Sequence, residues 1–404
     1  MRIVGGIYIE RSVFPESDVL YGSGGRAAAV LSKLNPEILL TSYVGEDKRR
    51  DIAYHAERLW DVELDGHEIS KTVTFTYYHG LSAPVIRPTL LLPGGAPTIE
   101  IDDDIILQFG MLEGMAVVRG NKVVFDPQNP EKPELFDANG SEAKTLSYVL
   151  NQNEARKISK SDTNDGAAEF LLRQSCVQVV VIKGGAFGAT VYTSTSKDTL
   201  AAYRTETVWP IGSGDVFAAV FAHFWAVENE SPVLAAKYAS RGAALYCGKK
   251  KIPLERNEIV IDDDKFVFPP ISLKKKPSEV TIYLAGPFFT MGQVWLVDEA
   301  RTALQGAGFK VFSPFHDVGI GDADTVVPKD IQGIEEADAM FALCDGLDAG
   351  TLFEIGYAVK KNIPVIAFGE QTSDEAMKML VGTGCHVYRD FVSAIYQIQW
   401  EALA

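Results

Sequence analysis

Short apolar runs rich in β-branched residues alternate with longer stretches of helical spacing along the whole chain, and this alternation constrains the fold most. Strand–helix–strand repeats favour a parallel sheet with helices on both faces. In the first two thirds of the chain, we expect strands at 2–9, 37–44, 122–126, 178–183 and 188–193 and helices at 25–34, 50–60, 164–173, 214–228 and 231–247. The pattern predicts an α/β fold.

The last third repeats this pattern on a smaller scale. Strands are expected at 280–285, 309–312, 339–343 and 363–368, and helices at 292–307, 328–336, 351–361 and 373–382. We therefore predict a second, smaller, doubly wound parallel sheet of the flavodoxin-like type, which binds ligands outside the carboxyl ends of its strands. Residues 72–101 differ, because an alternating run there leads into Pro- and Gly-rich turns, and we expect a β lid or flap.

A chain of 404 residues exceeds the size at which one hydrophobic core stops growing, so two domains are expected. Charge runs and prolines mark 262–279 as a linker that lies outside any core. We place the first domain at 1–268, the linker at 269–278 and the second domain at 279–404.

The net charge of −16 argues against binding to nucleic-acid polymers, because no basic stripe is available to replace counterions. No apolar run is long enough to span a bilayer, and the N-terminus has no signal-peptide pattern. The four cysteines are scattered without metal-ligand spacing, which favours reduced thiols. These features predict a cytoplasmic protein with small-molecule partners and no membrane contact.

The turn Gly212-Ser213-Gly214-Asp215 opens a predicted helix. Glycines let the backbone approach an anion, and the first-turn N–H groups with the helix dipole stabilise it. Asp215 would stand beside this anion site, placed to accept a proton from an attacking hydroxyl group. The alternative is that Asp215 only caps the helix.

Glu354 is a carboxylate among apolar neighbours in the stretch Asp348-Ala-Gly-Thr-Leu-Phe-Glu354-Ile-Gly-Tyr-Ala. A poorly solvated acid needs a chemical or structural reason. One structural reason is a capping box, in which Thr351 caps the helix and Glu354 reaches back to its amide. The competing interpretation is a catalytic carboxylate.

Three more residues favour catalysis at the same sheet edge. Tyr283 lies in a strand that ends in a small-residue turn, Asp330 precedes the next buried strand, and Asp348 follows that strand. We expect Tyr283, Asp330, Asp348 and Glu354 to converge on one cleft.

Residues 1–260 resemble the ribokinase, or PfkB-type, family of sugar and nucleoside kinases, which implies a three-layer αβα domain that binds ATP and Mg²⁺. The resemblance rests on the 212–215 turn, on Asn151-Gln-Asn-Glu154, on the strand and turn around Lys183 and on the Gly24-Gly25 turn. It implies Asp215 as the catalytic base and Glu154 as a magnesium ligand through water. By the same resemblance, nucleotide is bound by Gly212, Ser213, Gly214, Asn151, Glu154, Lys183 and Gly185, and the phosphate acceptor by Gly24 and Gly25.

The chain departs from this family at the acceptor side. Trp209-Pro210 replace the family's Asp-Thr, Ala29 replaces an Asn, and Glu10 stands for an early sugar-binding Asp. Two roles for the domain therefore stay open. One is phosphorylation of a sugar or nucleoside hydroxyl group, and the other is a nucleotide sensor that regulates the second domain.

Residues 280–400 resemble the nucleoside 2-deoxyribosyltransferase family, which also includes nucleotide N-glycoside hydrolases. The motifs are the strand Tyr-Leu-Ala-Gly-Pro, a following Asp, and Asp-x-Gly-Thr-x-x-Glu-x-Gly-Tyr-Ala. The resemblance implies Glu354 as the nucleophile, Tyr283 as its holder, and Asp330 and Asp348 as the acids that serve the base. It implies substrate contacts from Gly286, Pro287, Phe288 and Gly350, and a homo-oligomer whose sites borrow residues from neighbouring subunits.

This carry-over fits the chemistry of N-glycosidic bonds. A carboxylate beneath the anomeric carbon stabilises an oxocarbenium-like state and can form a covalent glycosyl intermediate. Attack by a second base gives a transferase, and attack by water gives a hydrolase. Asp348 would repel a substrate phosphate, which favours nucleosides over nucleotides. A third possibility is that both domains only bind ligands.

Overall fold

The computed structural model describes residues 1–88 and 96–404, and the chain divides into two compact units. Unit 1 comprises 1–205 and 209–270, and unit 2 comprises 206–208 and 271–404. Within the described residues, no helix is both long and apolar enough to cross a bilayer.

Unit 1 is built on a nine-stranded sheet, counted over the described residues, with the order β13-β12-β11-β10-β9-β8-β1-β4-β5. Its strands are β1 (Arg2–Val4), β4 (Leu39–Gly45), β5 (Glu63–Ile69), β8 (Ile99–Phe109), β9 (Ala116–Asp126), β10 (Glu142–Asn151), β11 (Val177–Lys183), β12 (Ala189–Tyr192) and β13 (Lys197–Leu200). Neighbours from β5 to β11 run parallel, and β12 and β13 continue the sheet antiparallel.

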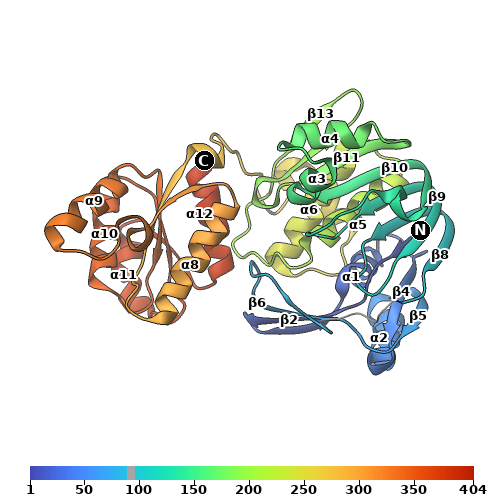
Figure 1. Ribbon diagram of the computed structural model, residues 1–404, viewed down its shortest axis with the longest axis horizontal. Coiled ribbons are helices and arrows are strands. Elements are labelled where there is room, and N and C mark those ends of the chain that lie inside the picture. The colour runs from blue at the N-terminus through green and yellow to red at the C-terminus, as the bar shows by residue number, and fades with distance from the viewer. Residues whose placement is uncertain (89–95) are drawn as a thin grey trace. The chain divides into compact units, whose positions relative to one another are not determined.

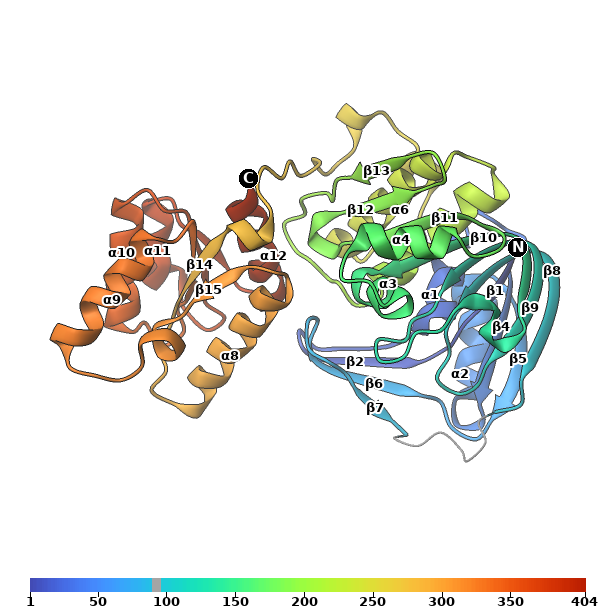
Figure 2. The same cartoon turned by 45° about the horizontal axis from the view of Figure 1, so that its top comes forward.

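Both faces of this sheet are buried because successive strand residues point to opposite sides. Ile3 packs in one hydrophobic core and Val4 in the other, and Leu107 and Ile106 divide in the same way. The helices of unit 1 are α1 (Gly22–Leu31), α2 (Arg49–Tyr54), α3 (Gln152–Ser159), α4 (Asn164–Leu172), α5 (Ser213–Ala222), α6 (Pro232–Lys249) and α7 (Arg256–Ile259). Helices α1, α5 and α6 cover one face, while α3 and α4 cover the other (Figure 2), which gives the predicted three-layer αβα architecture.

A separate sheet, with four strands among the residues that the structure describes, forms beside the main one in the order β3-β2-β6-β7. It consists of β2 (Ile9–Phe14), β3 (Ser17–Leu20), β6 (Thr74–His79) and β7 (Val85–Arg87). The predicted lid at 72–101 therefore corresponds in part to this sheet, although 99–101 belong to β8 and 89–95 lie outside the described residues. The single strand expected at 2–9 was wrong, because β1 ends at Val4 and the chain crosses Gly5 and Gly6 into the second sheet.

Residues 262–268 belong to unit 1, so the expectation that the whole range 262–279 lies outside any core was wrong at its start. Phe266 is buried in the core of unit 1, where its ring meets the Tyr203 ring edge-on at 4.8 Å between centroids. Burial of this apolar side chain holds the stretch against the core, although most of its neighbours are charged.

Unit 2 is a parallel five-stranded sheet with the order β15-β14-β16-β17-β18. Its strands are β14 (Thr281–Ala285), β15 (Lys310–Phe312), β16 (Ala339–Leu343), β17 (Val365–Phe368) and β18 (His386–Tyr388), and its helices are α8 (Met291–Gly306), α9 (Ala323–Glu335), α10 (Ala349–Lys360), α11 (Asp374–Gly382) and α12 (Phe391–Leu403). Figure 1 shows these elements in orange to red. The order corresponds to 2-1-3-4-5, which confirms the flavodoxin-like prediction and puts the topological switch point between β14 and β16.

Candidate active sites

The switch point of unit 2 holds a tyrosine–glutamate pair. Tyr283 lies on β14 and is fully buried, and Glu354 lies in α10 with its carboxylate turned toward that strand. The Tyr283 hydroxyl group donates a hydrogen bond to Glu354 Oε1 at 2.8 Å. The predicted pairing of these two residues is therefore present at the sheet edge where such folds bind ligands.

Helix α10 begins differently from the capping-box alternative. Its N-cap is Asp348, whose Oδ2 accepts hydrogen bonds from the Thr351 amide at 2.8 Å and the Thr351 hydroxyl group at 3.1 Å. Thr351 is thus the third residue of the helix, and the capping-box interpretation of Glu354 was wrong. The Glu354 carboxylate bonds to Tyr283 and is not needed to cap the helix.

Electrostatics at this edge favour protonated carboxyl groups. Burial raises the pKa of Glu354 to about 7; the Tyr283 hydrogen bond opposes this shift, and the charges of Asp330 and Asp348 add to it. Burial also raises the pKa of Asp330, which lies on α9. Among the described residues, Asp330 Oδ1 is a buried oxygen without a hydrogen-bond partner. Glu354 and Asp330 therefore both hold a proton more readily than exposed carboxyl groups do.

Three of the predicted substrate residues of unit 2 follow strand β14, and the fourth lies at the start of α10. Gly286 follows β14, and a Cβ there would come within 3.0 Å of Leu343 Cβ, so packing against β16 is one reason for the glycine. Phe288 is half-buried and packs on the Phe315 ring with centroids 5.3 Å apart. The remaining two are Pro287, which is buried, and Gly350, which is exposed in the first turn of α10.

In unit 1, the turn at 212–215 opens α5. Gly212 is the N-cap with φ of +80°, a conformation that favours glycine, and Ser213, Gly214 and Asp215 form the first turn. Within the described part of the chain, the amide groups of Gly214 and Asp215 have no hydrogen-bond acceptor. Such free first-turn N–H groups make a site for an anion.

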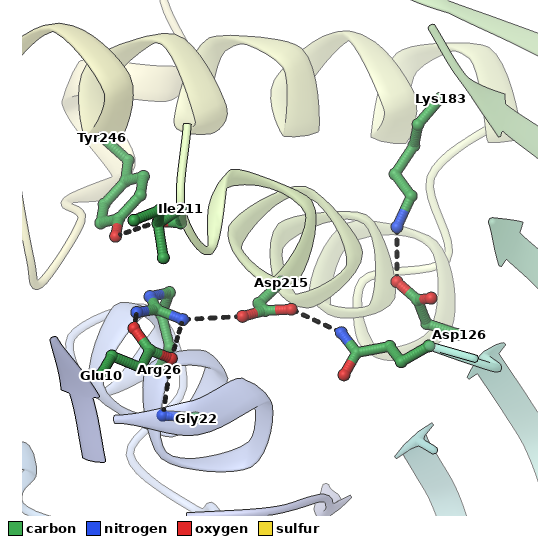
Figure 3. Close-up of polar contacts among 9 residues, drawn as sticks. Glu10, Gly22, Arg26, Asp126, Lys183, Ile211, Asp215 and Tyr246 are labelled. Atoms are coloured by element: carbon green, nitrogen blue, oxygen red, sulfur yellow. Dashed lines mark hydrogen bonds and ion pairs between the residues drawn. The ribbon is translucent and has the colours of Figure 1, made fainter. Parts of the chain in front are cut away.

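Lys183 supplies a positive charge beside this turn. Its ammonium nitrogen lies 3.4 Å from the position that a Cβ on Gly214 would occupy, and it bonds to Asp126 Oδ2 (Figure 3). Burial disfavours the lysine charge, but the neighbouring carboxylates of Asp126 and Glu154 outweigh it and raise the pKa of Lys183. Burial raises the pKa of Asp126 to about 7 against the effect of the ammonium group.

Asp215 is not the N-cap of α5, so the alternative that it only caps this helix was wrong. It is a buried residue in the first turn, and both of its carboxylate oxygens accept hydrogen bonds. Oδ2 accepts from Arg26 Nη1 at 2.8 Å, and Oδ1 accepts from Gln128 Nε2 at 2.5 Å. Figure 3 shows Arg26 between Asp215 and Glu10.

The other predicted nucleotide and acceptor residues of unit 1 all have structural roles. Asn151 caps α3 and forms a reciprocal capping box with Glu154, in which each side chain accepts the other's amide N–H at 3.0 Å. Gly185 has φ of +59° in the turn after β11. Side chains at Gly24 and Gly25 would collide with the Gly5 carbonyl group and with Trp60, respectively. Their ligand roles stay predictions.

Comparisons with known proteins agree with this geometry. Residues 119–252 match the family model described as pfkB family carbohydrate kinase, and residues 282–387 match nucleoside 2-deoxyribosyltransferase. Two family models thus match two successive parts of the chain, and we call the units that contain these parts the PfkB-type unit and the deoxyribosyltransferase-like unit. The PfkB match includes Asn151, Lys183 and Asp215 but begins after Glu10 and Arg26, and the second match includes Tyr283, Asp330, Asp348 and Glu354.

Similar solved structures include ribokinases and a fructokinase. Ribokinase from Thermotoga maritima is 18% identical over 62% of this chain and 93% of its own, with a TM-score of 0.43. Ribokinase from Giardia lamblia is 17% identical with the same coverages and a TM-score of 0.47. Fructokinase from Vibrio cholerae, bound to fructose, ADP and calcium ion, is 15% identical over 62% of this chain and 93% of its own, with a TM-score of 0.44. No curated protein matches the sequence.

The residues of the PfkB-type unit fit a phosphate group better than a bare metal ion. Free amide groups and the Lys183 ammonium group suit phosphate oxygens. Within 1–88 and 96–404, no three His, Cys, Asp or Glu side chains gather around one point that could hold a metal. A magnesium ion near Glu154 would therefore take most of its ligands from phosphate and water, as this ion commonly does.

Sequence reasoning missed the partners of Asp215 and Lys183. Arg26, Gln128 and Asp126 were not singled out, although Arg26 is the one charged residue in the segment Gly22–Leu31. A charge inside an otherwise small and apolar helix needs a buried partner, and that pattern was the available signal.

Proposed function

We propose that the deoxyribosyltransferase-like unit cleaves the N-glycosidic bond of a (deoxy)nucleoside with Glu354 as the nucleophile. The observation that carries this proposal is the 2.8 Å hydrogen bond from Tyr283 to Glu354 at the switch point of the sheet. A carboxylate held in one orientation by a buried donor is suited to attack an anomeric carbon.

The reaction proceeds in two steps. In the first, a Glu354 oxygen forms a bond to C1′ of the sugar, the bond from C1′ to the base nitrogen breaks, and the base leaves with a proton from a neighbouring acid. In the second, the bond between Glu354 and C1′ breaks as a new nucleophile attacks C1′ and gives up its proton. A second base as that nucleophile gives exchange, and water gives hydrolysis.

Asp330 is the better placed proton donor of the two aspartates. Asp348 uses Oδ2 to cap α10, whereas Asp330 has a buried oxygen without a partner among the described residues. Burial raises the pKa of Asp330, so its carboxyl group holds a proton more readily than an exposed aspartate does. The Asp348 carboxylate at the start of α10 would repel a substrate phosphate, which favours a nucleoside over a nucleotide.

For the PfkB-type unit, the specific observation is an anion site made of the Gly214 and Asp215 amides and Lys183, which supports binding of the phosphates of ATP. Mg²⁺ would accompany those phosphates and take most of its ligands from phosphate and water. Phosphorylation of a sugar or nucleoside hydroxyl group would further require a free oxygen on Asp215 as the base. Because both oxygens accept hydrogen bonds from Arg26 and Gln128, the contacts favour the nucleotide-sensing alternative over phosphoryl transfer.

Mass spectrometry of nucleosides and nucleotides after incubation with the protein tests the main proposal. We expect the wild type to release or exchange a free base, and Glu354→Gln to lower that rate at least about a thousandfold. Glu375→Gln is the matched control, because Glu375 lies exposed on α11 and, among the described residues, pairs only with Lys378. Base release by Glu354→Gln at the wild-type rate would overturn the proposal.

A further inference from the structure

The predicted base of the PfkB-type unit, Asp215, is hydrogen-bonded to Arg26, a side chain of the same chain. Arg26 projects from α1 and is 1% exposed. Its Nη1 donates to Asp215 Oδ2 at 2.8 Å and to Glu10 Oε1 at 3.1 Å, while Nη2 pairs with Glu10 Oε2. One guanidinium group thus joins two buried carboxylates that lie on different elements.

The same guanidinium group packs on the anion turn. A Cβ on Gly212 would lie 2.1 Å from Arg26 Cζ, so only a glycine leaves room for the arginine there. An acceptor hydroxyl must lie within hydrogen-bond reach of the base and next to the phosphate held by the turn. Arg26 is bonded to the base and touches the turn, so it fills that position.

The surroundings of Arg26 form a site for a cation. Two aromatic rings flank the guanidinium group, with Cζ 5.2 Å from the Tyr21 ring centroid and 5.7 Å from that of Tyr246. Tyr246 is fixed by its hydroxyl group, which donates to the Ile211 carbonyl oxygen at 2.7 Å. Glu10 is fixed as well, because Oε1 also accepts the Gly22 amide N–H at 3.1 Å. Carboxylates and aromatic faces are what a planar cation binds.

A neutral polyol cannot replace this cation without leaving two buried charges unpaired. Removing one partner of a buried ion pair costs free energy. A ligand that displaced Arg26 would have to supply this free energy, so its affinity would fall by about a hundredfold or more. An anionic acceptor would in addition meet Glu10 and Asp215, whose combined charge exceeds that of Arg26. The site therefore discriminates against the hydroxyl-bearing acceptors that a phosphotransfer would need.

We propose that Arg26 is a built-in occupant of the acceptor site, so that the PfkB-type unit holds a phosphate donor without passing phosphate to a sugar or nucleoside. The empty form of this site would select a guanidinium cation over a neutral molecule of the same shape. This inference rests on the proposed phosphate site of unit 1 and is independent of the glycosyl chemistry of unit 2.

The test replaces Arg26 and returns the missing group as a small molecule. We expect methylguanidinium to raise the melting temperature of unit 1 in Arg26→Ala saturably, whereas N-methylurea, its neutral analogue, leaves it unchanged. The wild type should respond to neither compound. Arg26→Gln serves as the second variant if the alanine variant does not fold, because it keeps much of the side-chain volume and lacks the charge.

Two further measurements separate the possible failures. The wild type, incubated with ATP, Mg²⁺ and a panel of pentoses and nucleosides, should give no phosphorylated product, and calorimetry should show ATP binding. Phosphorylated product from the wild type would overturn the inference, as would equal responses of a folded Arg26 variant to methylguanidinium and N-methylurea. Absence of ATP binding would instead contradict the phosphate site, while the methylguanidinium result would still decide the role of Arg26.

Discussion

The Tyr283 phenol donates a hydrogen bond to the Glu354 carboxylate across 2.8 Å, which links the first strand of unit 2 to a helix that begins 66 residues later at Ala349. Tyr283 is held by complete burial, and its ring stacks on Phe312 with centroids 5.5 Å apart. The donor is therefore rigid, and it fixes the orientation of the proposed nucleophile.

Removing this hydrogen-bond donor should impair catalysis without leaving a large cavity in the core. Tyr283→Phe keeps the ring and loses the hydroxyl group, so we expect kcat for base release to fall on the order of a hundredfold. Tyr357→Phe is the matched control, because that hydroxyl group bonds to Glu335 instead. Steady-state kinetics of both variants check the prediction, and equal effects of the two substitutions would argue against a special role for Tyr283.

Activity should rise with pH toward neutrality. Burial raises the pKa of Glu354 to about 7, and only the ionised carboxylate can attack C1′. We therefore expect kcat/KM to increase with pH up to about 7. In Tyr283→Phe the rising limb should move to higher pH. A profile that is flat between pH 5 and 8, a range set around that value, would contradict the assignment.

The raised pKa of Glu354 also predicts how the stability of unit 2 depends on pH. Since the folded-state pKa of Glu354 exceeds its ordinary value of 4.5, the folded protein binds more protons, and this group destabilises unit 2 as pH rises from 4.5 through about 7. Glu354→Gln should thus raise the free energy of unfolding by about 3 kcal/mol at pH 8 and by less than about 1 kcal/mol at pH 5. Thermal denaturation at both pH values measures this difference, and a stability loss at pH 8 would count against it.

Lys183 should matter for nucleotide binding by unit 1. Replacing it with Met removes the positive charge beside the anion turn, so we expect the Kd for ATP to rise about tenfold to a hundredfold. Because Lys183→Met leaves Asp126 buried without its partner, Asp126→Asn/Lys183→Met should recover stability but not affinity. Lys197→Met, on an exposed strand, is the surface control. Unchanged calorimetric affinity in the double variant would remove Lys183 from the proposed site.

Local patterns were enough to predict much of the fold. The parallel sheets and the strands at 280–285 and 339–343 were confirmed because short buried apolar runs between helices have few other solutions. Strand β10 and helix α12 were missed. In β10 the fully buried run spans only Leu146–Leu150, and α12 is buried nearly all round, so it lacks an amphipathic stripe.

The sequence allowed the key contact of one site to be predicted, but not that of the other. Motif resemblance alone suggested that Tyr283 holds Glu354, and the structure contains that contact. The contact between Arg26 and Asp215 joins residues 189 positions apart, and nothing in either local pattern specifies it. Its consequence, an acceptor position filled by the chain's own side chain, depends on how α1 packs against α5 and becomes evident only in three dimensions.

Attack of Glu354 on the sugar can be detected with a substrate that reacts slowly. A 2-fluoro-arabinosyl nucleoside destabilises the oxocarbenium-like state, so a glycosyl-enzyme formed from it should persist long enough for peptide mass spectrometry. We predict one sugar adduct per chain, on the peptide that carries Glu354, and none in Glu354→Gln. Base release without any adduct on that peptide, or an adduct on another residue, would show that Glu354 is not the nucleophile.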